Sequence, residues 1–79
     1  MPYTAHRIDP NHSQNLGDFS IVRRYRKNGY EDSQFYHYNS ETGRLINRGA
    51  WHMPVISHGS RIYNGCMKAI GQLLAEEEA

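Results

Sequence analysis

Apolar and polar residues alternate most regularly in residues 19–51, where three β-prone runs are separated by two turns that contain glycine. The first run, residues 19–26, alternates with a period of two, which predicts a half-buried strand. Asn28-Gly29 follows it, and this dipeptide is a strong indication of a two-residue hairpin turn because both residues tolerate positive φ. The pattern therefore predicts an antiparallel hairpin closed at residues 28–29.

The next two runs extend this hairpin into a three-stranded meander. Residues 34–38 are rich in aromatic side chains, which suit a pleated, half-buried surface. Residues 39–43 contain Asn, Ser and Gly, and Gly43 can take the left-handed conformation of a four- or five-residue loop. The third strand is predicted to run from Arg44 to about Ala50.

The predicted register divides the side chains of the meander between two faces. A two-residue turn places Lys27 opposite Tyr30 and Val22 opposite Phe35. The predicted core face carries apolar and aromatic residues, namely Phe19, Ile21, Tyr36, Tyr38 and Leu45, with Tyr25 and Trp51 at its ends. The other face carries Val22, Phe35 and Ile46 among the basic residues Arg24, Arg26, His37, Arg44 and Arg48. A one-residue bulge in the second turn would move Arg44, Ile46 and Arg48 off this basic face.

A C-terminal helix is predicted to cover the core face. Apolar residues recur there at spacings of three and four, namely Ile62, Tyr63, Cys66, Met67, Ile70, Leu73 and Leu74. Ser60 is placed to cap its start, and Gly65 or Gly71 is a candidate for a close approach to the sheet. Glutamates at 76–78 oppose the helix dipole, so the end of the helix is predicted to fray. Val55 and Ile56, in the linker before the helix, are predicted to close one end of the core.

Residues 1–18 have no sustained period and predict a loop or arm, with residues 4–8 as a short edge strand in the alternative. The predicted fold is therefore α+β: an N-terminal arm (1–18) followed by a single β-β-β-α domain with an acidic tail (19–79). A chain of 79 residues supplies a net stability of only about 3–5 kcal/mol from its core, so a homodimer or a bound partner would add to it.

The overall net charge of +1 conceals an uneven distribution. Residues 1–75 carry nine Lys or Arg against five Asp or Glu, a balance of +4, while three glutamates stand together near the C-terminus. A single cysteine excludes an intramolecular disulfide and a cysteine-based zinc cluster and favours a reducing compartment. The chain has neither a signal-peptide pattern nor an apolar run of about 18 residues, so a cytoplasmic protein without a membrane partner is expected.

No catalytic motif stands out. Cys66 lies on the apolar stripe of the predicted helix, where a buried thiol is expected rather than a reactive one. The five histidines lack a metal-binding spacing, and no glycine-rich phosphate-binding motif occurs. The sequence therefore predicts a binding module that is not an enzyme, with no catalytic residue, no metal and no cofactor.

Four of the nine Lys and Arg residues fall within five positions of the first predicted hairpin. Such a local basic patch indicates a negatively charged partner, either nucleic acid or an acidic surface of a protein or ribonucleoprotein complex. The residues predicted to bind this partner are Arg23, Arg24, Arg26, Lys27, Tyr30, Phe35, His37, Arg44 and Arg48.

Two resemblances bear on the partner. The order of elements in residues 19–74, three strands and a helix, resembles the arm-type DNA-binding domains of phage integrases and the AP2 domains of plants, which implies a sheet presented to the major groove. The short chain with its Tyr- and Arg-rich surface also resembles small accessory proteins of phages and mobile elements, including anti-CRISPR proteins. That resemblance implies an inhibitor that binds a host protein complex, and the two hypotheses stand level.

A third hypothesis comes from residues 35–43 followed by Trp51-His52-Met53-Pro54. These residues resemble the second hairpin and the closing W-x-x-P of WW domains. The resemblance implies an adaptor that binds proline-rich peptides.

Overall fold

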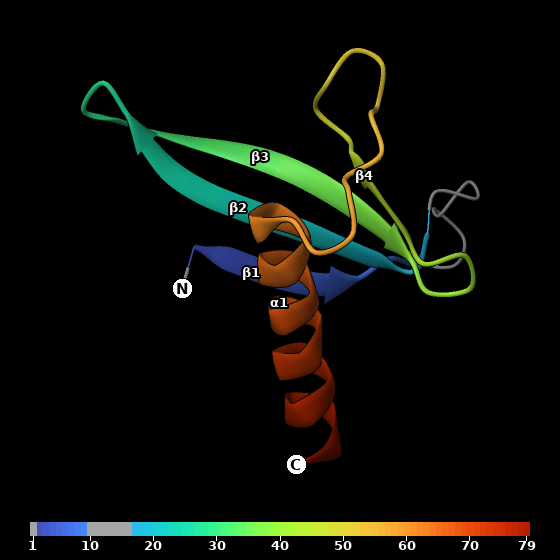
Figure 1. The fold of residues 1–79 in the computed structure, drawn as a ribbon. Coiled ribbons are helices and arrows are strands. Elements are labelled where there is room, and N and C mark those ends of the chain that lie inside the picture. The colour runs from blue at the N-terminus through green and yellow to red at the C-terminus, as the bar shows by residue number, and fades with distance from the viewer. Residues whose placement is uncertain (1, 10–16) are drawn as a thin grey trace.

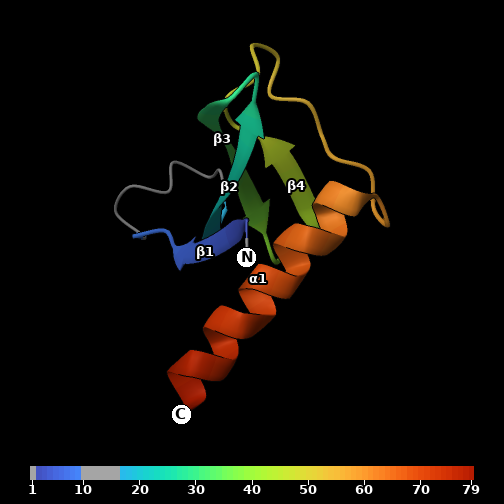
Figure 2. The same cartoon turned by 90° about the vertical axis from the view of Figure 1, so that its left-hand side faces the viewer.

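The computed structural model describes residues 2–9 and 17–79 and has one antiparallel sheet with a helix on one of its faces (Figures 1 and 2). The four strands lie side by side in chain order. The elements are β1 Tyr3–Arg7, β2 Phe19–Lys27, β3 Tyr30–Asn39, β4 Arg44–Asn47 and α1 Arg61–Glu78. The α+β class is confirmed, but the sheet has four strands where the sequence pattern predicts three.

The additional strand is β1, which corresponds to the edge-strand alternative for the N-terminal arm. It pairs antiparallel with β2 and places Ala5 opposite Ile21. Ala5 is the one buried residue among its five, so β1 lacks the apolar alternation that identifies the other strands. Residues 1 and 10–16 of the predicted arm lie outside the described residues.

The hairpin of β2 and β3 has the predicted register. Lys27 lies opposite Tyr30 and Val22 lies opposite Phe35. Asn28 and Gly29 have φ angles of 53° and 81°, as the predicted turn requires. Pairing continues without interruption to the turn, so β3 begins at Tyr30 and is longer than the aromatic run predicts.

The third predicted strand is shorter than expected because β4 ends at Asn47 and the chain then turns away. Gly43 has a φ of 71° in the loop that precedes β4. Tyr38 pairs with Leu45, and His37 pairs with Ile46, without a bulge. A short segment returns to the outer side of β4, where the amide of Ile56 donates to the carbonyl of Leu45 at 2.8 Å.

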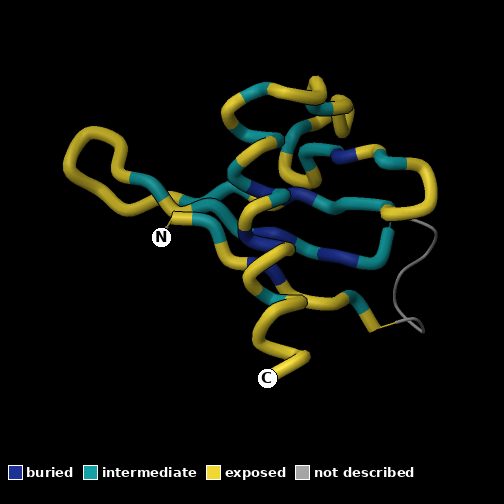
Figure 3. The backbone as a smooth tube through the Cα atoms, turned by 60° about the horizontal axis from the view of Figure 1, so that its bottom comes forward, coloured by how far each residue is buried: buried dark blue, intermediate teal, exposed yellow. Residues whose placement is uncertain are grey.

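The core lies between α1 and the covered face of the sheet (Figure 3). Its buried members come from β1, β2, β3, β4 and α1: Ala5, Phe19, Ile21, Tyr36, Leu45, Cys66, Ala69 and Ile70. Tyr38 and Ile56 pack against this cluster. The predicted core face is thus largely confirmed.

Two predictions about the rim of the core are wrong. Trp51 is 91% exposed, since β4 ends four residues before it and the following loop directs it into solvent, where it contacts His52 with ring centroids 4.6 Å apart. Val55 is 56% exposed, and Ile56 alone of the linker pair packs on the core.

The helix begins with a cap at Ser60, whose side-chain oxygen accepts a hydrogen bond from the Tyr63 amide at 3.2 Å. Of the two glycines in α1, Gly65 is the one at a close approach to the sheet: a Cβ there would lie 2.5 Å from the ring of Tyr3, whereas a Cβ at Gly71 would meet nothing within 4 Å. The predicted fraying is wrong, because α1 continues to Glu78 and Glu77 accepts two hydrogen bonds from Arg7, at 2.8 and 2.9 Å.

Candidate functional site

The sheet face opposite α1 carries most of the residues predicted to bind a partner. The strand register and the alternation of side chains place six residues of β2, β3 and β4 on this side, and Arg48 continues the pattern because its amide donates to the Phe35 carbonyl at 2.7 Å. We call this set the open face: Arg24, Arg26, Phe35, His37, Arg44, Ile46 and Arg48.

Three of the predicted residues lie on the other side of the sheet. Arg23 is on the same side as Tyr25, and its guanidinium carbon lies 5.0 Å from the centre of that ring. Lys27 and Tyr30 face each other beside the turn, and Tyr30 is 78% exposed. The basic cluster of the sequence is therefore divided between two faces, because neighbouring strand residues point in opposite directions.

The arginines of the open face have no carboxylate partner among the residues that the structure describes. The one salt bridge among residues 2–9 and 17–79 joins Arg7 to Glu77 at the far side of the molecule. Arg26 donates to the Gly29 carbonyl at 3.4 Å, and Arg48 lies 3.5 Å from the sulfur of Met53. Glu31 is the nearest acid by register, opposite Arg26. These guanidinium groups thus remain available for an anionic partner.

His37 lies within the open face as a partly buried side chain. Its Nδ1 atom is buried and has no hydrogen-bond partner among the described groups. Burial lowers the pKa of His37, and the positive charge of Arg48 lowers it further. The imidazole is therefore neutral at neutral pH and contributes an aromatic ring rather than a fifth positive charge.

Beyond β1 and β4 the hairpin continues as a two-stranded ribbon (Figures 1 and 3). On the β1 side, the hydrogen bond nearest the turn runs from the Arg24 amide to the Pro2 carbonyl. On the β4 side, it runs from the Arg48 amide to the Phe35 carbonyl. Residues 25–34 consequently have no third strand beside them in the described part of the chain. A depression of about 350 Å³ on this ribbon is lined by Arg24, Tyr25, Arg26 and Glu31.

The chemistry of the remaining polar groups is limited. Cys66 is fully buried in the core, and burial raises the pKa of its thiol to about 12. In the parts of the chain that the structure describes, no group of three or more His, Cys, Asp or Glu is placed to hold a metal ion. Nor does any helix there have the length and apolar character needed to cross a membrane.

One feature near β1 has no counterpart among the predictions. A groove of about 270 Å³ lies between β1 and α1. It arises from a tertiary contact between residues 3–5 and residues 69–76, which are far apart in the chain, and β1 itself lacks a clear alternation. No sequence pattern could therefore indicate it.

Comparison with protein-family models, with curated proteins and with solved structures finds no significant match. Function is therefore inferred from the geometry and charge of these surfaces.

Proposed function

We propose that the protein is a non-catalytic module that binds duplex DNA through the open face and the projecting ribbon. The observation that supports this most directly is the set of four arginines on the uncovered face, none of which has a carboxylate partner among the described residues. Cations that neutralise phosphates release counterions, which is the main source of affinity for nucleic acids.

The shape of the hairpin favours duplex DNA over a single strand. The major groove of B-DNA is about 12 Å wide and admits a two-stranded β-ribbon. Residues 25–34 form such a ribbon, with no strand or helix beside them in the described chain. The loop residues Gly49 and Ala50 share a pocket with Tyr25 and residues 32–34, so residues 26–31 are the part of the ribbon that is free to enter the groove. Arg24 and Arg26 project from one side of it, where they can reach base edges or the flanking phosphates.

The apolar part of the open face has a role in the same complex. Phe35 is 49% exposed and lies opposite Val22 on this face, with Arg24 and Ile46 at diagonal positions on the neighbouring strands. An aromatic or aliphatic side chain in the major groove packs against the thymine methyl group or the deoxyribose. The arginines would thus position the sheet, and Phe35 would add contact area at its centre.

The test is a salt titration of binding to mixed-sequence duplex DNA. The variant Arg24→Glu/Arg26→Glu removes two phosphate contacts. The matched control Arg61→Glu/Lys68→Glu makes the same change in net charge on exposed positions of α1, which covers the opposite side of the sheet. Single-stranded DNA and RNA of the same length serve as alternative ligands.

Four phosphate contacts predict a slope of log K against log salt of about −3.6 for the unmodified protein, and the open-face variant should reduce its magnitude by about 2. The α1 control should retain the original slope. If both variants lost the same amount of affinity for duplex DNA, binding would depend on net charge rather than on the open face. If the unmodified protein did not bind duplex DNA at low salt, the proposal would be refuted. Tighter binding to single-stranded DNA or RNA than to duplex DNA would contradict insertion of the ribbon into the major groove.

A protein partner is the second candidate, favoured by two exposed aromatic side chains. Tyr30 and Trp51 are 78% and 91% exposed, and Tyr and Trp are enriched among the residues that dominate protein–protein affinity. An acidic protein surface would also suit the unpaired arginines. This hypothesis requires that Trp51→Ala weaken partner binding by tenfold or more, whereas DNA binding through the open face and the ribbon should change much less.

A further inference from the structure

The outer edge of β1 carries backbone N–H and C=O groups that form no backbone hydrogen bond within residues 2–9 and 17–79. The bonds from the Arg24 amide to Pro2 and from the Ile8 amide to Asp18 show which positions of this ladder are hydrogen bonded. Hydrogen-bonded pairs alternate along antiparallel strands, so Thr4 and His6 bond to β2. The N–H and C=O groups of Tyr3, Ala5 and Arg7 consequently point outward, away from the sheet.

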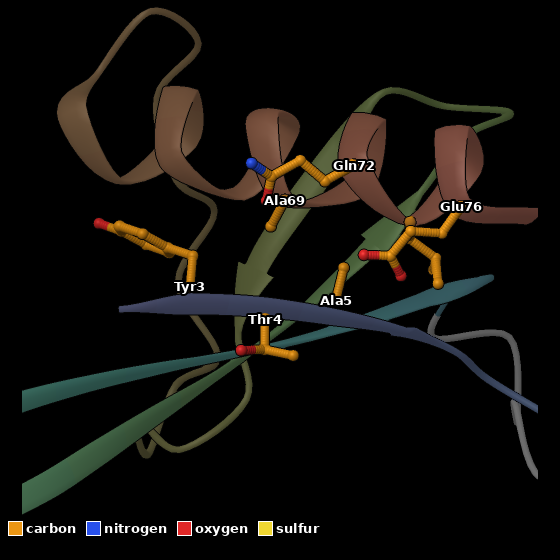
Figure 4. A pocket seen from close by; sticks show the side chains of 7 residues that line it. Tyr3, Thr4, Ala5, Ala69, Gln72 and Glu76 are labelled. Carbon is orange, nitrogen blue, oxygen red and sulfur yellow. The ribbon is translucent and has the colours of Figure 1, made fainter. Parts of the chain in front are cut away.

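This edge is one wall of the groove that lies beneath α1 (Figure 4). Tyr3 and Ala5 project from β1 toward the helix, and Ala69 and Glu76 project from α1 toward the strand, while the side chain of Gln72 extends along the helix toward Ala69. Leu73 completes the helical wall of this space of about 270 Å³. A sheet edge with a helix beside it is the arrangement in which an extended peptide adds as a strand.

The walls of the groove differ in polarity along its length. Ala5, Ala69 and Leu73 give it an apolar part, and Glu76 supplies a carboxylate that forms no salt bridge within the described chain. The neighbouring Glu77 is already bound to Arg7. The charge of the groove therefore favours a partner with a positive side chain at the position that faces Glu76.

We propose that this groove binds an extended peptide segment of a partner protein, which pairs antiparallel with β1 and places a Lys or Arg side chain against Glu76. The peptide exchanges backbone hydrogen bonds with Tyr3, Ala5 and Arg7. In a sheet, directly opposite residues point to the same face, so the peptide residues opposite Tyr3, Ala5 and Arg7 direct their side chains toward α1. One of them contacts Leu73, and another contacts Glu76. This site is separate from the open face and does not depend on DNA binding.

A second copy of the chain is the other occupant to consider, and the position of α1 disfavours it. The helix packs chiefly on β1. Two β1 strands paired antiparallel in one sheet would place both copies of α1 on the same face, and each α1 crosses β1 and continues beyond the sheet edge, over the β1 strand of the other copy (Figure 1). The two copies of α1 would therefore collide, and a single strand without a helix fits the edge better.

The test selects ligands from a displayed library of random nine-residue peptides on the immobilised full chain. Selected sequences should alternate in polarity and carry a basic residue on one face. The probe is one such peptide, labelled with fluorescein for anisotropy. Glu76→Lys should weaken its binding by about tenfold or more because an attraction becomes a repulsion. Glu78→Lys, at the same helix end but outside the groove lining, should not.

Amide hydrogen exchange measured by NMR supplies a readout that does not depend on any variant folding. The peptide should protect the amides of Tyr3, Ala5 and Arg7, whose hydrogens point outward, and leave those of Thr4 and His6 nearly unchanged.

Several results would overturn the proposal. These are failure to select any peptide, equal effects of Glu76→Lys and Glu78→Lys, or protection of amides outside β1. Protection of the same three amides by increasing protein concentration alone, with a dimer in ultracentrifugation, would assign the edge to self-association instead. The Arg24→Glu/Arg26→Glu variant should bind the peptide normally, so a failure of DNA binding would leave this result unaffected.

Discussion

Trp51 shows how a single residue can depart from the pattern around it. As a large aromatic at the end of an alternating run it is predicted to be buried, yet it is 91% exposed because β4 stops at Asn47. The smaller residue Cys66 is fully buried because α1 places it against the sheet. Burial at the rim of this core depends on where an element ends rather than on the size or polarity of the side chain.

Replacement of Trp51 by Ala should change the free energy of unfolding by less than about 0.5 kcal/mol, as for an exposed position. Ile70→Ala removes a side chain that is 6% exposed in the core and should cost about 2–5 kcal/mol. Urea unfolding followed by circular dichroism measures both, since Trp51 is the only tryptophan and its fluorescence is lost in the variant. A larger loss for Trp51→Ala than for Ile70→Ala would contradict the observed core.

At the scale of elements, the distance between α1 and β1 depends on the absence of a side chain at Gly65. The ring of Tyr3 occupies the space that a Cβ would take, with three ring atoms within 2.9 Å of it. The helix can approach β1 this closely only at a glycine, and this contact supports the groove beside it.

Gly65→Ala and Gly71→Ala form a matched pair within one helix. Alanine favours a helix over glycine by about 1 kcal/mol, so Gly71→Ala should stabilise the protein by about 0.5–1 kcal/mol because a Cβ there meets nothing within 4 Å. Gly65→Ala should destabilise it by about 1–3 kcal/mol, since Tyr3 must move. Thermal unfolding of both variants checks the sign, and stabilisation by both would show that the Tyr3 contact carries little energy.

The elements that the sequence predicts well are those fixed by local chemistry. Asn28-Gly29 determines the turn, and from it follows the whole register of β2 and β3, including the placement of Arg24 and Arg26 on one face. The strand β1 could be predicted only as an alternative, because its pairing with β2 is a long-range contact that leaves one buried residue in five.

At the scale of the whole molecule, charge is separated in a way that composition does not reveal. The open face carries four arginines, whereas the acidic end of α1 lies by the groove beside β1. The sequence identifies the basic residues, but it cannot indicate that Glu77 folds back onto Arg7 or that Glu76 lines a groove. Both depend on the direction of the helix across the sheet.

The folded molecule also holds two carboxylates in their charged form. Burial alone would raise the pKa of Asp18, but hydrogen bonds from the hydroxyl and amide of Ser40 outweigh it and lower that pKa. The hydrogen bonds from Arg7 lower the pKa of Glu77. Each carboxylate thus stabilises the fold at neutral pH and ceases to do so as the pH falls below about 4.

His37 adds an earlier step to this acid dependence. Its pKa is lowered in the fold by burial and by Arg48, so the unfolded chain binds a proton first as the pH falls below about 6.5. Stability should therefore decline in two stages, one that begins as the pH falls below about 6.5 and one below about pH 4. His37→Gln should abolish the first stage and leave the second, and Asp18→Asn should reduce the second alone. Urea midpoints between pH 3 and 8 measure these changes; an unchanged first stage in His37→Gln would place its origin elsewhere.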